Sequence, residues 1–327
     1  MRPTMSLIRR EFAAYFTGPI GYVALFGFLT LTGFLFWIVV GLLTDKGPRG
    51  VEYPMQVMLG GAESPEWALV AGVLFWGLFP AVTGIITSRL IAEERGSGTL
   101  EALLTAPIRD WQVVVAKFVA CFAFYLLLWA TTLVYLPILT DLKAEWTGTV
   151  TYYAVVLLVG LLFLVLAKVG FWFEFNGWLV LALGILGLGL TGAGAYFHYT
   201  ADAEQLVKLT AGIDPRPVFT SYLGVVLAGA MFLSLGLLVS SWVKSQLVAW
   251  MLSLLLGLCF VLPAALRWAF EPGTPGYSVA YYLGVPEHFR RDFTRGVIDT
   301  RPLVLYATVT LACLYLTVRS LEARRLK

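Results

Sequence analysis

Charged residues are scarce in this sequence, since only 13% of its 327 residues are Asp, Glu, Lys or Arg and 59% are hydrophobic. An ordinary soluble domain is about 25% charged, so this chain has too little polar surface to cover a water-soluble globule. The mean hydropathy of +0.81 leads to the same interpretation. Composition therefore excludes a soluble domain and predicts a protein whose solvent is the lipid bilayer.

Cysteine and histidine are also rare, which removes several kinds of catalytic or metal site. Cys121, Cys259 and Cys313 lie in apolar runs and form no C-x-x-C pair, so neither a disulfide framework nor a thiolate metal site is indicated. His198 and His288 belong to no ligand motif, and neither HExxH nor GxSxG occurs. We therefore predict no catalytic residue, metal or cofactor in this chain.

Two sequence features resemble ligand-binding signals but are explained without a ligand. The net charge of +3, from 23 basic and 20 acidic residues, is too balanced for a nucleic-acid partner. Residues 187–192 match GxGxxG, but they lie inside an apolar run, where small residues allow helices to approach closely. No Gly-Lys pair occurs, so the phosphate-binding loop GxxxxGK[ST] is absent. If ATP powers this protein, another polypeptide must bind it.

Eight stretches free of Asp, Glu, Lys and Arg approach or exceed the length of a spanning helix, which is about 20 apolar residues. They cover residues 12–44, 67–88, 118–140, 146–167, 175–201, 217–243, 245–266 and 302–318. The first is punctuated by Gly18-Pro19, which predicts a helix start at about Pro19. We predict an all-α, polytopic membrane helix bundle of about eight transmembrane helices, forming one domain over residues 1–327.

The distribution of Lys and Arg predicts which loops face the cytoplasm. Cytoplasmic loops carry an excess of these residues, and placing both termini inside gives the inner side the larger share of the 23. Basic pairs at 9–10 and 324–325 flank the first and last spans. We expect a multi-pass protein of the cytoplasmic (inner) membrane with both termini inside. Lys117 and Lys244, near inner ends of spans, are expected to snorkel to the headgroups.

The loop between the second and third predicted spans has the pattern of a short helix between two breaks. Gly96 and Gly98 interrupt the extension of the second span, because glycine adopts backbone angles that end helices. Ser97 or Thr99 can cap a new helix, and Pro107 stops it. The predicted helix is about nine residues long, too short to be stable alone in water.

One face of this short helix is apolar, because Leu100, Leu103 and Leu104 fall at i, i+3 and i+4. The headgroup region or the protein's own spans could receive that face. A groove on a cytoplasmic partner could equally receive it, with polar contacts around it from Glu93, Glu94, Arg95 and Glu101. The residues alone leave these alternatives open.

The run from Arg89 to Pro107 resembles the coupling-helix segment of ABC-2 type permeases, which has an acidic-basic pair, then G-T-L-E, then L-L-x-x-P. Residues 10–22 are similar to the N-terminal segment of the gliding-motility-associated permeases, and residues 293–301 and 316–325 add further matches in the family's order. The resemblance therefore touches both ends of the chain and its middle.

The resemblance implies the permease subunit of an ATP-driven exporter, paired with a second permease chain in a homodimer or with a related chain. ATP and Mg would be bound by a partner ABC ATPase subunit. A coupling helix over residues 93–107 would contact that ATPase. The implied ATPase-coupling residues are Glu93, Glu94, Arg95, Gly96, Gly98, Thr99, Leu100, Glu101, Leu103, Leu104 and Pro107.

Two segments depart from or extend the six-span pattern usual in this family. Residues 141–217 are predicted to insert an extra helical pair. Residues 267–301 form an outer segment in which apolar residues from Phe289 to Ile298 recur at helical spacing, which predicts an amphipathic interfacial helix. The alternative role implied by the resemblance is an outer gate or interface formed by Phe289, Arg290, Phe293, Arg295 and Asp299.

Two other functional classes compete with the exporter. An ATPase-independent secondary transporter or channel is disfavoured because its spans would commonly hold acidic residues or histidines. An intramembrane enzyme is disfavoured because no nucleophile and base can be nominated. The spans themselves select no substrate.

Overall fold

The computed structural model describes residues 2–17, 19–46, 59, 65–99, 109–135, 215–266, 270–271 and 273–325, with scattered positions between 164 and 192. All secondary structure in these residues is helical, which confirms the all-α prediction for this part of the chain. Two predicted spans, over 146–167 and 175–201, and most of the predicted insertion over 141–217 lie outside the described residues. The leucine-bearing part of the predicted coupling helix, residues 100–107, also lies outside them.

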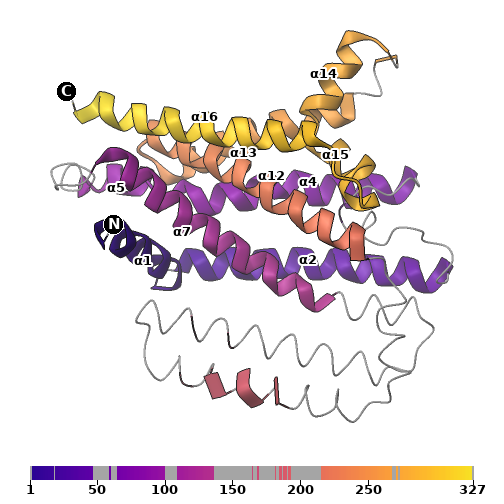
Figure 1. The fold of residues 1–327 in the computed structure, drawn as a ribbon, viewed down its shortest axis with the longest axis horizontal. Coiled ribbons are helices and arrows are strands. Elements are labelled where there is room, and N and C mark those ends of the chain that lie inside the picture. The colour runs from indigo at the N-terminus through magenta and orange to yellow at the C-terminus, as the bar shows by residue number, and fades with distance from the viewer. Residues whose placement is uncertain are drawn as a thin grey trace. The chain divides into compact units, whose positions relative to one another are not determined.

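Seven long helices overlap the other six predicted apolar runs (Figure 1). They are α1 (Arg2–Thr17), α2 (Pro19–Lys46), α4 (Pro65–Ser88), α7 (Asp110–Thr131), α12 (Pro215–Trp242), α13 (Gln246–Leu266) and α16 (Thr300–Arg325). The shorter helical elements are α5 (Ala92–Gly96), η1 (Thr132–Val134), α14 (Pro275–Leu283), α15 (Val285–Arg291) and η3 (Phe293–Arg295). The first apolar run is divided at Pro19, as predicted.

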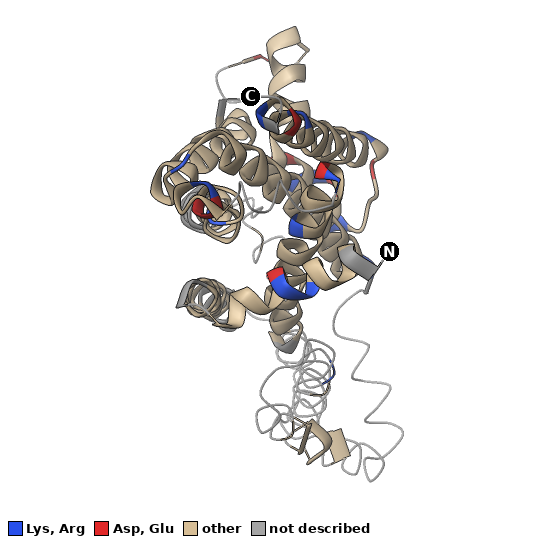
Figure 2. Ribbon diagram, turned by 90° about the vertical axis from the view of Figure 1, so that its left-hand side faces the viewer, with Lys and Arg blue, Asp and Glu red and all other residues tan. Residues whose placement is uncertain are grey.

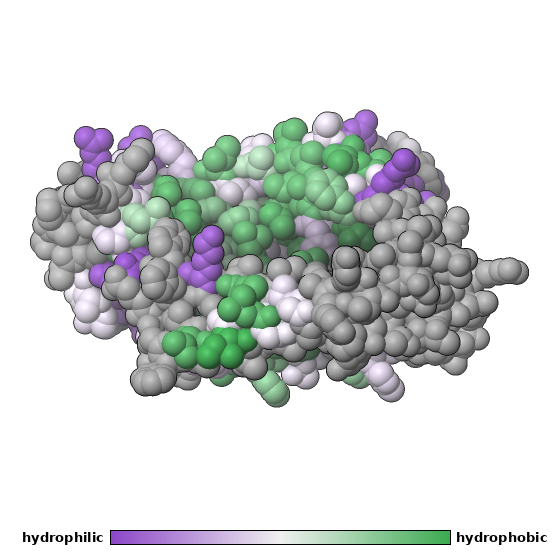
Figure 3. Space-filling model, turned by 60° about the horizontal axis from the view of Figure 1, so that its bottom comes forward, coloured by the Kyte–Doolittle hydropathy of each residue, from purple (hydrophilic) through white to green (hydrophobic). Residues whose placement is uncertain are grey.

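Four described helices are long and apolar enough to cross a membrane: Asp110–Thr131, Arg216–Trp242, Gln246–Ala265 and Thr300–Arg324. A fifth span results if Thr4–Thr17 and Gly21–Trp37, which meet at 68°, are counted as one bent span. On the face seen in Figure 3, hydrophobic residues gather in the middle and most hydrophilic residues lie toward its ends. These features confirm a multi-pass membrane helix bundle.

The chain forms two compact units. Unit 1 comprises Met1–Phe28, Met55–Leu126 and Arg216–Lys327, and unit 2 comprises Leu29–Pro54 and Leu127–Pro215. In unit 2, the ring of Phe36 on α2 stacks on Tyr135, with centroids 4.4 Å apart. Every residue of the two sites described below belongs to unit 1.

Helix α12 is the central helix of unit 1. Of the most hydrophobic 18-residue stretch of α12, 78% is buried within the protein, against 17% of the corresponding stretch in α13 and 22% in α16. Small residues permit this close packing: Gly229 lies against the ring of Tyr125 on α7, and Gly236 lies against Thr87 on α4. The Tyr125 hydroxyl also donates a hydrogen bond of 2.8 Å to the carbonyl of Val225. Helix α12 is therefore packed tightly against both α7 and α4.

Unit 1 has two ends of different composition. We call the end that holds α1, α5 and the last turns of α16 the terminal end, because both chain termini lie there (Figure 1). Figure 2 looks onto this end and shows basic and acidic residues on several of its helices. Helices α14 and α15 and the turn η3 lie at the opposite end.

Candidate functional site

A serine on α12, which is distant in sequence, stabilises the break between α4 and α5. Helix α4 ends at Ser88, and α5 begins at Ala92. The Ser240 hydroxyl on α12 accepts hydrogen bonds from the backbone N–H groups of Ile91 and Ala92, at 3.1 and 3.0 Å, and donates one of 3.1 Å to the Ser88 carbonyl. It thus satisfies backbone groups that a helix end leaves without intrahelical partners.

The position of this break corrects the sequence prediction. Gly96 and Gly98 were expected to interrupt the extension of α4, but the helix stops at Ser88, because the Ser240 hydroxyl supplies an alternative partner there. Gly98 still has a role, since its φ of +77° is a left-handed conformation that favours glycine in the turn after α5. Gly96 permits close packing, since an added Cβ would lie 2.9 Å from the Lys244 carbonyl oxygen.

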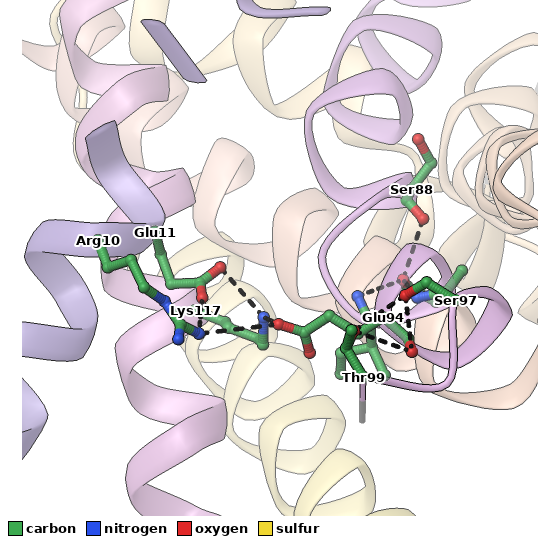
Figure 4. A network of polar contacts seen from close by, with 10 residues as sticks. Arg10, Glu11, Ser88, Glu94, Ser97, Thr99 and Lys117 are labelled. Carbon is green, nitrogen blue, oxygen red and sulfur yellow. Dashed lines mark hydrogen bonds and ion pairs between the residues drawn. The ribbon is translucent and has the colours of Figure 1, made fainter. Parts of the chain in front are cut away.

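A buried lysine joins three elements at the terminal end (Figure 4). The side chain of Lys117 on α7 has no solvent exposure. Its Nζ lies 3.0 Å from Glu11 Oε2 on α1 and 2.7 Å from Glu94 Oε1 on α5. Arg10 Nη2 lies 3.0 Å from Glu11 Oε1 and 4.0 Å from Glu94 Oε1. We call these four residues the ion cluster.

The ion cluster corrects the expectation that Lys117 snorkels to the headgroups. Its side chain is enclosed by protein, because two carboxylates from other elements compensate its charge. Breaking a buried ion pair leaves an uncompensated charge, which costs about 3–5 kcal/mol. The cluster therefore ties the position of α5 to those of α1 and α7.

Glu94 is the least fully paired member of the ion cluster. Burial raises the pKa of its carboxyl, and the nearby Lys117 ammonium opposes that rise. Its Oε2 is buried and has no hydrogen-bond partner among the described residues. Oε1 alone carries its contact with Lys117. Glu94 therefore keeps one buried carboxylate oxygen that no described side chain satisfies.

Some of the other predicted coupling residues lie among the described residues, and the rest lie outside them. Glu93, Gly96, Gly98 and Thr99 are exposed, whereas Arg95 is half-buried and donates a hydrogen bond to the Trp242 carbonyl at the end of α12. A second group, Leu100, Glu101, Leu103, Leu104 and Pro107, lies outside the described residues. Sequence reasoning missed Glu11, Lys117 and Ser240, because their partners lie far away along the chain.

The opposite end is built on aromatic packing. Phe289 is fully buried, with its ring centroid 4.8 Å from that of Trp76 on α4 and 5.2 Å from that of Phe293. Phe293 in turn lies over Gly224 on α12, where an added Cβ would be 2.8 Å from its ring. The Thr220 hydroxyl donates to the Phe293 carbonyl. These two aromatic residues therefore anchor the outer segment to α4 and α12.

This packing corrects the prediction of one interfacial helix running through to Ile298. Helix α15 ends at Arg291, the turn η3 follows, and Gly296 adopts a left-handed φ of +83° that stops helical continuation. Phe289 and Phe293 are buried, whereas Val297 and Ile298 are exposed, so the predicted apolar stripe is divided.

The charged residues proposed for the outer gate have separate contacts. Arg290 pairs with the buried Glu287, its Nη2 lying 2.7 Å from Oε1. The Asp299 carboxylate accepts a hydrogen bond of 2.9 Å from the backbone N–H of Arg301 at the start of α16. Arg295 is exposed. Of the five predicted gate residues, Phe289 and Phe293 are thus buried, and the three charged residues do not contact one another in the described residues.

Next to them lies a buried histidine to which the sequence assigned no role. The Nδ1 of His288 lies 2.9 Å from the Tyr306 hydroxyl on α16, and the imidazole is almost fully buried. Burial lowers its pKa to about 4, so the ring is neutral at physiological pH. No group of three or more His, Cys, Asp or Glu side chains suited to a metal ion occurs in the described residues.

Comparison with known protein families identifies one match. The model of a family described as ABC-2 family transporter protein matches residues 21–185, just over half of the chain. Neither a curated protein nor a solved structure matches the chain significantly. The matched segment contains α4, α5, α7 and the break that Ser240 holds.

Proposed function

This chain belongs to the ABC-2 family of transporter proteins, and we propose that it is the permease subunit of an ATP-driven exporter. The family and the apolar helices identify a membrane transport component, and in this proposal the chain has no enzymatic activity of its own. In this proposal a separate ABC ATPase subunit binds ATP and Mg. A second permease chain, identical or related, completes the transporter.

The observation that carries the proposal is the way α5 is held at the terminal end. This five-residue helix begins the segment that resembles a coupling helix, and Glu94 connects it through Lys117 to α7 and Glu11 of α1. Ser240 and Arg95 connect the same segment to α12. A force applied to residues 93–107 would therefore reach three long helices through direct polar contacts.

The proposed mechanism follows from linkage. A ligand shifts a conformational equilibrium only if its affinity differs between the two states. The leucine face formed by Leu100, Leu103 and Leu104 must therefore contact the ATPase differently when ATP is bound. Closure of the ATPase would move residues 93–107, and the ion cluster would pass that movement to α1 and α7.

Five further features belong to the same proposal. Both termini lie in the cytoplasm, and the protein resides in the inner membrane, as the excess of basic residues near both ends favours. Residues 141–217 add a helical pair to a six-span core, giving eight spans. The resemblance of residues 10–22 supports membership of the gliding-motility-associated subgroup. Arg295 and Asp299 contribute to the exit surface.

The decisive experiment compares ATPase binding by charge variants of residues 93–107. In the purified complex, Leu103→Asp and Leu104→Asp should abolish co-purification of a cytoplasmic protein that carries a phosphate-binding loop, because each places a charge on the apolar face. The matched control is Ala102→Asp, which adds the same charge at a helical position facing away from the leucines.

We expect the control to retain the ATPase and all three variants to insert into the membrane at the level of the wild type. Unchanged ATPase binding by both leucine variants would overturn the proposal. So would equal loss of binding in Ala102→Asp, because the effect would then not depend on the leucine face.

A further inference from the structure

Two basic side chains at the terminal end lie beside the last turn of α12. The Arg95 guanidinium donates a hydrogen bond to the Trp242 carbonyl. On the α16 side, the Ser320 and Ser241 hydroxyls are 3.2 Å apart, which brings Arg324, one turn further along α16, to the same helix end. Arg95 and Arg324 are close enough for their like charges to repel each other.

A third basic residue, Lys244, lies in the turn that follows α12. Its carbonyl oxygen would be 2.9 Å from a Cβ placed on Gly96, so the backbone of this turn touches the end of α5. The residue is exposed to solvent. Three elements, α5, the turn after α12 and the end of α16, thus bring one cationic residue each to one place. We call Arg95, Lys244 and Arg324 the basic patch.

Among the described residues, no acidic side chain pairs with a member of the basic patch. Within the part of the chain that the structure describes, none of its three members forms an ion pair. Arg319, only five residues before Arg324, differs because it pairs with Glu322 at 2.8 Å. The C-terminal carbonyls of α12 provide only a partial negative charge. The basic patch therefore offers a site for an anion.

The surface beside the basic patch indicates which anion. Trp242 is 52% exposed and Leu247 is 64% exposed, and both flank Lys244. Helix α13, which starts at Gln246, has only 17% of its apolar window buried within the protein. Exposed tryptophan and basic residues at the end of an apolar helix are typical of headgroup depth. At that depth a phospholipid places its phosphate beside the charges and its acyl chains along α13, which a soluble acidic protein does not.

We propose that Arg95, Lys244 and Arg324 bind the phosphate of an anionic phospholipid whose acyl chains lie along α13. Basic pockets between the ends of transmembrane helices are suited to such headgroups. The site requires only that the terminal end reaches the membrane surface, and so it is independent of the proposed ATPase partner. Because Arg95 belongs to α5, a bound lipid adds a contact that restrains α5 next to Glu94 of the ion cluster.

The test measures lipid binding to the full-length protein by native mass spectrometry in detergent. Phosphatidylglycerol is titrated against phosphatidylethanolamine, which carries no net charge. Each basic residue near a headgroup contributes about 1 kcal/mol, or about fivefold in affinity. Lys244→Gln and Arg324→Gln should each weaken phosphatidylglycerol binding about fivefold, and the double variant about 25-fold. Arg319→Gln, the matched control, removes a charge that Glu322 already balances and should leave binding unchanged.

Three results would overturn the proposal. One is equal affinity of the wild type for the two lipids, a measurement that does not depend on how the variants fold. Another is an equal loss in Arg319→Gln, which would indicate a general effect of net charge. The third is unchanged lipid binding in the double variant together with loss of the ATPase subunit, which would make the basic patch a protein contact.

Discussion

The two ends of unit 1 are held together by different interactions. At the terminal end, elements far apart in sequence meet through charges and hydrogen bonds centred on Lys117 and Ser240. At the opposite end, Phe289 and Phe293 pack on Trp76 and Gly224, and the nearby histidine is neutral. Polar contacts can exchange partners when a ligand binds, whereas closely packed rings resist displacement. Under the proposed function, the terminal end is therefore the part that moves and the opposite end is the part that anchors unit 1.

Removing the central cation should have the largest effect. Lys117→Met leaves the buried Glu11 and the half-buried Glu94 without their shared partner, so we expect the free energy of unfolding to fall by about 3–5 kcal/mol. Denaturant unfolding of the detergent-solubilised protein measures this change.

The control for this variant removes the charges of both carboxylate partners of Lys117 as well. Adding Glu11→Gln and Glu94→Gln to Lys117→Met removes the uncompensated charges, and replacing a complete buried ion pair by neutral groups is often nearly neutral for stability. The triple variant should therefore recover most of the lost stability while losing coupling to the ATPase. Wild-type stability of the single Lys117→Met variant would contradict the assigned role of the ion cluster.

The serine that holds the break should have an intermediate effect. Ser240→Ala leaves the buried backbone N–H groups of Ile91 and Ala92 without their acceptor, which should cost about 1–3 kcal/mol in unfolding free energy. Ser253→Ala is the matched control, because its buried hydroxyl donates to Ala249 of its own helix. A cost no larger than that of the control would mean that Ser240 does not define the break.

The third effect is expected at the opposite end, where it is absent at neutral pH and appears only as the pH is lowered. Burial lowers the pKa of His288 from 6.5 to about 4, so between these values the unfolded chain binds more protons than the folded one. The contribution of His288 should therefore make stability fall as the pH is lowered from 6.5 to 4. Thermal unfolding at a series of pH values should show a shallower fall in His288→Gln than in the wild type.

Tyr306→Phe tests whether burial or the contact with the Tyr306 hydroxyl lowers the pKa of His288. It removes the hydroxyl 2.9 Å from Nδ1 but keeps the imidazole in place, so the pH dependence should persist. Identical pH dependence of the wild type and His288→Gln would show that this histidine is not buried in neutral form.

Sequence patterns predicted the elements that depend on local composition. Apolar runs gave six of the helical regions, and Gly18-Pro19 marked the start of α2 because proline restricts the backbone locally. The break after Ser88 was misplaced, since the residue that causes it, Ser240, is 148 positions from Ala92. The burial of Lys117 was missed for the same reason, because Glu11 is 106 positions away.

The outer segment shows a second limit of sequence patterns. The spacing of Phe289 and Phe293 fits one face of a helix, yet they occupy α15 and η3, on either side of the end of the helix. Helical spacing alone does not reveal the left-handed conformation of Gly296 or the close contact between Phe293 and Gly224. This part of the fold depends on contacts between residues that are distant in sequence, which a local pattern does not reveal.

The most direct test of the account is the side of the membrane from which residues 93–107 can be reached. Replacing Cys121, Cys259 and Cys313 by alanine and introducing Thr105→Cys gives one labelling site. A membrane-impermeant maleimide should label it in inside-out vesicles stripped of peripheral proteins but not in intact cells. Adding back the ATPase should protect it. Labelling from the cell exterior would contradict the claim that a cytoplasmic ATPase moves this permease through that segment.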